Sequence, residues 1–456
     1  MTMVLRLIVG FGAWVLLILA ISNSAQAKNS EQGVNDIKVP QVLAHRDRAE
    51  PINRILKHRL DVLLPELMAE SELDMWLVIN REYGEDALFY TLVPEPTFAA
   101  RRTTLLVFVR NEEGVERFSV SRYPIAGFYE SRWQGGTDQQ QWQRLVEIIK
   151  DYDPQKIGIN VSEEWAVADG LSQGLYSTLM SHLPEELQKR VVSSEELVVR
   201  WFETRTKPEK EVYPQIVAIA RGVIAEAFSS KVITPGVTTD KDIAWYIRER
   251  FEELGVKPWF QPYVTVQRKG DTNDPESPFF GRSDRVIMPG DIIHTDVGLC
   301  YLKLCTDTQE MGYVARFGEY EVPKGLKEAL AKGNQWQDIL TSQYKTGRTG
   351  NEILKATQVA AKKQKLNSST YTHPLGFVGH AVGPTIGMWD NQGPTPVKGD
   401  RKLYPNTAYA IEGNVKVKLP EWDNQLIQIM LEQSALFDGE RVIYLAGRQT
   451  EWHFIR

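Results

Sequence analysis

The spacing of apolar and polar residues changes near residues 200–208 and predicts different elements on either side of this stretch. Before it, residues 59–68 have the spacing of an amphipathic helix, and residues 75–79 form a short apolar run typical of a buried strand. Two further strand-like runs flank Asn111–Gly114, which favours a hairpin turn there. The N-terminal part is therefore predicted to be an α/β domain.

After this stretch the pattern predicts long helices followed by strands. The clearest helix lies within residues 236–255, where Thr239 or its neighbour is placed to cap the start and Gly255 to end it. A weaker copy of this pattern, Gly-x-Thr leading into a helix, begins at Gly347 and hints at an internal duplication with one residue of slippage.

Two aspartates stand eleven residues apart in HTDVGLCYLKLCTD, residues 294–307, which otherwise reads as buried strand. A hairpin turning at Tyr301–Leu302 would place Asp296 opposite Asp307 on one face, where two like charges are destabilising unless a cation lies between them. The alternative is two unrelated surface aspartates on an irregular loop. His294 shares the face of Asp296, and strand packing explains it better than ligation.

Two glutamates and a histidine extend this pattern downstream. Glu412 lies in YAIEGNV and Glu432 in LIQIMLEQSALF, while a glycine precedes His380 in HPLGFVGHAVG. Acidic side chains are almost never fully buried unless they are paired. Four carboxylates and one imidazole therefore indicate a shared partner, and a pair of divalent cations such as Mn, Fe, Co or Zn would satisfy all of them.

The start of the chain predicts its compartment. Residues 1–27 are typical of a secretory signal peptide, because Arg6 precedes an apolar run and Ala25-Gln26-Ala27 supplies a small-residue cleavage site. We expect cleavage near Ala27 and a periplasmic or secreted mature protein without membrane attachment. The alternative is an uncleaved anchor, for which the apolar run is short.

Composition narrows the range of partners. The formal net charge is −6 and no run of lysines or arginines occurs, which argues against nucleic acid as a partner. The two cysteines, Cys300 and Cys305, are too few for a disulfide framework or a zinc finger. We interpret them as packing residues, although an oxidising compartment would allow a bond between them.

The order of these motifs resembles that of the pita-bread metallopeptidases, which include Xaa-Pro aminopeptidase, prolidase, methionine aminopeptidase and the non-metal relative creatinase. The matching segments are PGDIIHTDVG, CTDTQ, Gly-His-x-x-Gly, Ile-Glu-Gly and LEQSALFDGE. The resemblance implies an α/β (α+β) fold. A creatinase-like N-terminal domain, residues 28–204, would precede a pita-bread domain, residues 205–456, with a curved antiparallel sheet and flanking helices.

The resemblance also implies roles for these residues. Asp296 would bind a first metal ion, His380 and Glu412 a second, and Asp307 and Glu432 would bridge both. Glu412 would also accept the proton of the attacking water. The implied activity is metal-dependent hydrolysis of the N-terminal bond of short peptides, of Xaa-Pro aminopeptidase type, by a homodimer or homotetramer.

Two departures from the family pattern concern histidines. The family places one about seventeen residues before the first aspartate and one seven after the ligand histidine, which here fall near Phe279 and at Gly387. His373 is a candidate catalytic replacement, with a hydrogen-bonded loop histidine as the alternative. Trp389 and Asp390 are candidates for lining the substrate pocket, with core packing as the alternative for the tryptophan.

Three functions therefore stay open at this point. A metallopeptidase is favoured because the full set of candidate ligands is present and clustered carboxylates would be costly without a cation. A pita-bread protein that binds a ligand or partner without catalysis would explain the missing histidines. A metal hydrolase of non-peptide amides is the third, since fold and metal site do not fix the substrate.

Overall fold

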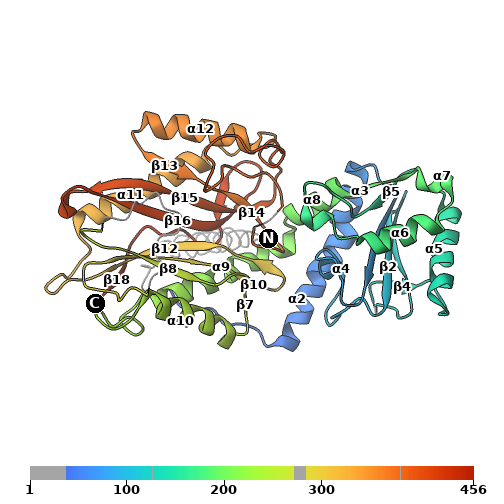
Figure 1. The fold of residues 1–456 in the computed structure, drawn as a ribbon, viewed down its shortest axis with the longest axis horizontal. Coiled ribbons are helices and arrows are strands. Elements are labelled where there is room, and N and C mark those ends of the chain that lie inside the picture. The colour runs from blue at the N-terminus through green and yellow to red at the C-terminus, as the bar shows by residue number, and fades with distance from the viewer. Residues whose placement is uncertain (1–36, 126, 272–283, 381) are drawn as a thin grey trace, which may run out of the picture.

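A computed structural model describes residues 37–125, 127–271, 284–380 and 382–456 (Figure 1). The predicted signal peptide and Phe279 lie outside these residues. Among the helices described, none is long and apolar enough to cross a membrane. The described chain forms a six-stranded sheet, a nine-stranded sheet and a small sheet of three short strands.

The six-stranded sheet belongs to the N-terminal part, on the right of Figure 1, and its strands follow the order β4-β3-β2-β1-β5-β6. Asn111 pairs with Gly114 at the end of a hairpin, as predicted, and the predicted strand over residues 75–79 is confirmed. The strands are β1 (Met75–Arg81), β2 (Thr103–Asn111), β3 (Gly114–Ser121), β4 (Glu130–Ser131), β5 (Ile157–Ile159) and β6 (Val191–Ser193).

Helices cover both faces of this sheet, which explains why β1 reads as a continuous apolar run. Trp76 and Val78 pack with α2, α3 and α8, whereas Met75 and Leu77 pack with α5 and α6 on the other face. The predicted helix over residues 59–68 is confirmed as one continuous helical stretch of α2, a π-helical turn and α3. The elements are α2 (His45–His58), η3 (Arg59–Leu63), α3 (Leu64–Glu70), α4 (Phe89–Leu92), α5 (Asp138–Tyr152), η4 (Ala166–Ala168), α6 (Gln173–His182), α7 (Glu185–Gln188) and α8 (Glu195–Glu203).

The nine-stranded sheet belongs to the C-terminal part and is antiparallel except where β18 runs parallel to β12, among the pairs described. Its central order is β13-β15-β16-β12-β9-β8, with β14 beside β15, β17 beside β16 and β18 beside β12. The strands are β8 (Tyr263–Gln267), β9 (Ile292–Val297), β12 (Thr308–Val314), β13 (Asn367–Thr370), β14 (His373–Leu375), β15 (Thr407–Leu419), β16 (Gln425–Phe437), β17 (Val442–Tyr444) and β18 (His453–Ile455).

Helices α11 and α12 pack against the core that holds Ile411, and α9 and α10 pack against a second core that holds Ala408 and Ala410. Ile411 packs in the same core as Trp336 of α11, so the next residue, Glu412, points to the opposite face. The α/β architecture with an antiparallel sheet and flanking helices is as predicted (Figure 1). The helices are α9 (Lys207–Ala227), α10 (Asp240–Glu253), α11 (Lys324–Thr341) and α12 (Gly350–Lys363), and a short η5 (Pro420–Trp422) follows β15.

Helices α10 and α12 begin in the same way. Thr239 and Thr349 are their N-caps, each in a capping box with an acidic residue three positions later. Ahead of each cap, a glycine with positive φ donates its N–H to a distant strand-like segment, Gly236 to Ile287 and Gly347 to Leu403. The repeated pattern in the sequence therefore corresponds to a repeated structure.

The hairpin that carries the two aspartates exists, but its turn lies one residue later than predicted, which shifts the strand pairing by two residues. The turn falls at Leu302–Lys303, and Asp296 pairs with Gln309 instead of Asp307. Both turn residues adopt positive φ, a conformation that the sequence does not signal because neither is glycine or asparagine. Asp307 is two residues from Gln309, so the two aspartates still share one face, as diagonal neighbours.

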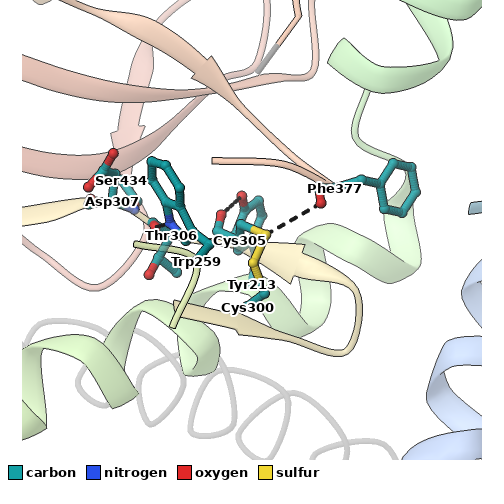
Figure 2. The surroundings of a disulfide bond; sticks show 8 residues. All are labelled: Tyr213, Trp259, Cys300, Cys305, Thr306, Asp307, Phe377 and Ser434. Carbon is teal, nitrogen blue, oxygen red and sulfur yellow. Dashed lines mark hydrogen bonds between the residues drawn. A yellow bond between two sulfur atoms is a disulfide. The ribbon is translucent and has the colours of Figure 1, made fainter. Parts of the chain in front are cut away.

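The two cysteines form a disulfide, which corrects their interpretation as packing residues (Figure 2). They are directly opposed on β10 (Leu299–Tyr301) and β11 (Leu304–Cys305), which form the small sheet with β7 (Lys257–Pro258). The Cys305 carbonyl accepts a hydrogen bond from the Tyr213 hydroxyl at 2.5 Å, and its N–H donates to Gly376 at 2.7 Å. These contacts fix the chain two residues before Asp307.

Candidate metal centre

A row of polar side chains crosses adjacent strands of the large sheet, on the face opposite α11. Because side chains alternate along a strand, residues paired in register share a face. Glu412 pairs with Glu432, Glu432 with Gln309, and Gln309 with Asp296. Residues more than a hundred positions apart thus come together through strand register.

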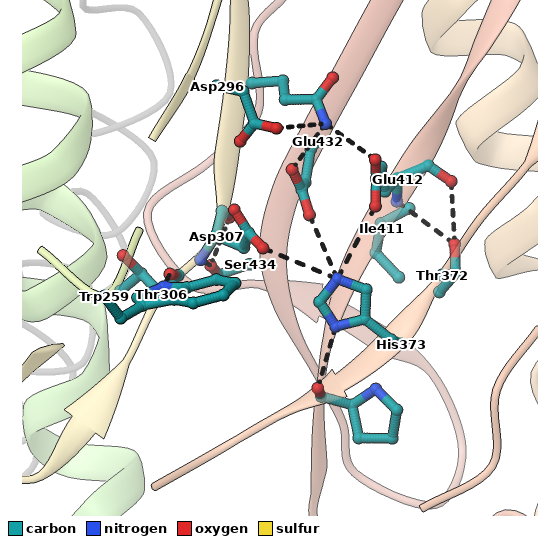
Figure 3. Close-up of polar contacts among 12 residues, drawn as sticks. Trp259, Asp296, Thr306, Asp307, Thr372, His373, Ile411, Glu412, Glu432 and Ser434 are labelled. Atoms are coloured by element: carbon teal, nitrogen blue, oxygen red, sulfur yellow. Dashed lines mark hydrogen bonds and ion pairs between the residues drawn. The ribbon is translucent and has the colours of Figure 1, made fainter. Parts of the chain in front are cut away.

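His373 lies at the centre of three of the carboxylates (Figure 3). Its Nε2 is 3.7 Å from Asp307 Oδ2, from Glu412 Oε2 and from Glu432 Oε1. Its Nδ1 lies 3.1 Å from the Pro374 carbonyl, which fixes Nδ1 as the protonated nitrogen. The Nε2 lone pair therefore points toward the carboxylates, as it does in a histidine that binds a metal ion.

The buried polar atoms of this cluster fit divalent cations. The described structure offers no hydrogen-bond partner to His373 Nε2, Glu432 Oε1, Asp296 Oδ1 or Asp307 Oδ1. Ligand atoms of Asp296, Asp307 and Glu432 lie within 4.8 Å of one another, as do those of His373, Glu412 and Glu432. Carboxylate oxygens with one imidazole suit Mn, Fe, Co or Zn.

Protonation states in the cluster reflect its burial. Burial raises the pKa of Asp296 to about 7. Burial, and then repulsion among the carboxylates, also raises the pKa values of Asp307, Glu412 and Glu432. Burial, with His380 nearby, lowers the pKa of His373 to about 3, so its imidazole is neutral and able to bind a cation.

Removing metal ions is expected to destabilise the protein more at high pH than at low pH. These carboxyl groups have higher pKa values in the folded chain than in the unfolded chain, so the metal-free protein loses stability as pH rises from about 4 through about 7. Thermal unfolding of EDTA-treated protein should show this fall, and added Mn²⁺ should raise the midpoint more at about pH 8 than at about pH 5. A metal-free midpoint that is constant over this range would contradict the account.

His380, the histidine predicted as a metal ligand, lies at the rim of the cluster. It is exposed, and its ring centre is 4.8 Å from that of His373 and 4.9 Å from that of Trp259. One of its nitrogens comes within 4.8 Å of ligand atoms of Asp307 and His373, so it borders the site. The geometry favours His373 for the central position, and His380 then follows it by seven residues, the spacing expected for the second family histidine.

Several residues near the cluster were not anticipated from the sequence. The Trp259 indole donates a hydrogen bond to the Thr306 carbonyl at 2.8 Å (Figure 3). The indole also packs directly against two glycines, where a larger residue would clash with it. A Cβ at Gly298 or Gly379 would come within 2.0 Å or 2.1 Å of the indole. Tyr263 and Tyr371 also border the carboxylates, and nothing in their local sequence marks them. Gln309, the last residue of the CTDTQ segment, lies among the carboxylates as well.

Trp389 and Asp390, predicted to line the substrate pocket, lie in an exposed turn bounded by mutual backbone hydrogen bonds of Met388 and Asn391. This turn follows Ile386, which pairs with Thr372 next to His373. Their role in substrate binding stays a prediction.

The chain was compared with known families and structures. Residues 212–437 match the family described as metallopeptidase family M24. Curated protein sequences gave no match. An X-Pro aminopeptidase from Thermotoga maritima superposes with a TM-score of 0.62 at 17% identity, covering 86% of this chain and 100% of that one.

Two further solved structures are similar. An Xaa-Pro dipeptidase from Bacillus anthracis gives a TM-score of 0.57 at 17% identity, covering 90% of this chain and 100% of that one. Zinc-substituted aminopeptidase P from Escherichia coli, in complex with product, gives 0.58 at 13% identity, covering 88% and 95%. At these identities the likeness establishes the fold.

Proposed function

Residues 212–437 of this chain belong to metallopeptidase family M24, so the protein is a metal-dependent peptidase, and we propose that it removes the first residue of short peptides whose second residue is proline. The observation that carries the proposal is the placement of His373 Nε2 at 3.7 Å from the carboxylates of Asp307, Glu412 and Glu432. The names of structural neighbours, an X-Pro aminopeptidase and an Xaa-Pro dipeptidase, support the substrate class.

The proposed ligand set keeps the four predicted carboxylates and places His373 where the sequence suggested His380. Asp296 would hold one ion, His373 and Glu412 the other, and Asp307 and Glu432 would contribute to both. Divalent ions bound there would polarise the scissile carbonyl and lower the pKa of an attacking water.

The protein's own groups would supply proton transfer and substrate placement. Glu412 is the ligand most open to solvent among those placed around His373, with its side chain 18% exposed. It is the proposed acceptor of the water proton. His380 stands at the rim, where it could contact the substrate carbonyl or leaving amine. Trp259 lies beside Asp307, where its indole donates to the Thr306 carbonyl.

The proposal extends to location and assembly. The Cys300–Cys305 disulfide supports an oxidising compartment, in line with the signal peptide predicted over residues 1–27. We therefore propose a periplasmic or secreted enzyme. A homodimer or homotetramer remains part of the proposal by family resemblance alone.

Hydrolysis of a matched peptide panel tests the specificity. We expect a tripeptide Xaa-Pro-Xaa with a free amino group to be cut at least about tenfold faster than its Xaa-Ala-Xaa counterpart, and the N-acetylated form to stay intact. Cleavage of the acetylated peptide at the same rate would contradict an aminopeptidase. Equal rates for proline and alanine would contradict the Xaa-Pro preference.

The second candidate, a binding protein without catalysis, loses part of its support. It rested on two histidines absent from the sequence pattern, and His380 now occupies one of those positions relative to His373. Retained metal binding without cleavage of any peptide would shift the proposal to a hydrolase of non-peptide amides.

A further inference from the structure

The side-chain amide of Gln309 lies among the carboxylates that would hold the ions. Its Nε2 donates to Glu412 Oε1 at 2.9 Å and to Glu432 Oε2 at 2.9 Å, and it lies 3.4 Å from Asp296 Oδ2. Gln309 is 5% exposed and belongs to β12, between the strands of Asp296 and Glu432. A neutral donor is thus built into the middle of an anionic cluster.

His294, supported by Thr265, fixes the orientation of the Gln309 amide. Gln309 Oε1 lies 2.9 Å from His294 Nε2, and His294 Nδ1 lies 3.3 Å from the Thr265 hydroxyl. Because a carbonyl can only accept, Nε2 of His294 carries the proton and the threonine hydroxyl donates to Nδ1. The reverse amide orientation would turn the Gln309 carbonyl oxygen toward the carboxylate oxygens. Ionised carboxylates only accept hydrogen bonds, so this orientation would be repulsive. His294 therefore holds Gln309 with its N–H groups toward the acids.

In this arrangement, each of the two glutamates directs one carboxylate oxygen toward His373 and the other toward Gln309. Glu432 turns Oε1 toward His373 and gives Oε2 to Gln309, while Glu412 turns Oε2 toward His373 and gives Oε1 to Gln309. A residue that bridges two ions needs one oxygen for each of them. For an ion on the Asp296 side, Glu432 can offer only Oε2. This oxygen already accepts a hydrogen bond from the Gln309 amide.

The two halves of the centre are therefore unequal. On the His373 side, the imidazole Nε2 and Glu432 Oε1 have no hydrogen-bond partner in the described residues, so an ion there displaces no protein donor. On the Asp296 side, an ion must compete with the Gln309 N–H groups for Glu432 Oε2 and Asp296 Oδ2. Breaking hydrogen bonds to charged acceptors in a buried site is costly.

We propose that the side-chain amide of Gln309 weakens the binding of a second divalent ion on the Asp296 side of this centre. This inference rests on the proposed metal-dependent function. It assigns Gln309 as a positioning residue that orients both glutamates toward His373, with His294 and Thr265 as its support.

Manganese binding to the metal-free protein tests the inference. Equilibrium dialysis against Mn²⁺, followed by elemental analysis, should give one tight ion for the wild type and a second at least about tenfold weaker. Gln309→Met keeps the side-chain length and removes the donors, so it should tighten the second ion by about tenfold. Gln309→Ala should act in the same direction if methionine disturbs packing.

A matched control is Gln267→Ala. Gln267 is an equally buried amide on β8, and it exchanges hydrogen bonds with the Gln428 backbone at 2.9 Å and 2.8 Å, away from the carboxylates. Its loss should leave both Mn²⁺ affinities unchanged, even if the thermal midpoint falls.

Two results would overturn the inference while leaving the peptidase in place. These are two Mn²⁺ ions of equal affinity in the wild type, or a second-ion affinity in folded Gln309→Met and Gln309→Ala that stays within about twofold of the wild type. Absence of any bound Mn²⁺, Co²⁺ or Zn²⁺ would instead overturn the metal-dependent function and this inference together.

Discussion

Replacing Asp307 by alanine is expected to lower peptidase turnover by at least about a thousandfold, or about 4 kcal/mol of transition-state stabilisation. Asp307 offers Oδ2 toward His373 and a second buried oxygen without a partner, so it is placed to serve ions on both sides. Initial rates on an Xaa-Pro peptide, measured with saturating Mn²⁺, check this.

The fold should survive the change. Burial, and then repulsion from the neighbouring acids Asp296 and Glu412, raises the pKa of Asp307. Removing it therefore relieves repulsion in the metal-free protein, and the thermal midpoint in EDTA should not fall. Asp151→Ala, at an exposed position of α5, serves as the control and should keep full activity. Full activity in Asp307→Ala would refute the bridging assignment.

His373→Ala and His380→Ala are expected to separate metal binding from catalysis. His373 is central and its free nitrogen faces three carboxylates, so its loss should remove the tightly bound ion and lower kcat by at least about a thousandfold. His380 lies at the rim, so its loss should leave the metal content unchanged and lower kcat by about a hundredfold.

Elemental analysis and kcat of the two purified variants, side by side, make this check. The opposite pattern, with metal lost in His380→Ala and kept in His373→Ala, would restore His380 as the ligand. Loss of metal in both variants would place both imidazoles on the ion.

Elements with strong local signals could be predicted from the sequence. Residues 75–79 are apolar throughout because β1 is covered on both faces, and Thr239 caps α10 with its own side chain. The four acids could be found because each lies in an apolar segment, which is unusual for a charged residue. Their gathering follows from strand register.

Features that depend on long-range packing could not be predicted. The turn at Leu302–Lys303 carries no glycine or asparagine, so the sequence pattern could not predict its position. His373 precedes a proline and reads as loop, yet it lies on β14 and pairs with Ala410 of β15, two residues from Glu412. Gln309 carries no charge, and only its neighbours across the sheet reveal its role.

The single measurement that tests the central claim is metal content together with metal-dependent hydrolysis of an Xaa-Pro peptide. The mature protein is analysed as purified, after EDTA, and after return of Mn²⁺, Co²⁺ or Zn²⁺. The account predicts bound divalent metal, loss of activity with EDTA, and recovery of first-residue release when metal returns. Hydrolysis that continues unchanged after complete removal of metal, or protein that never binds metal, would contradict it.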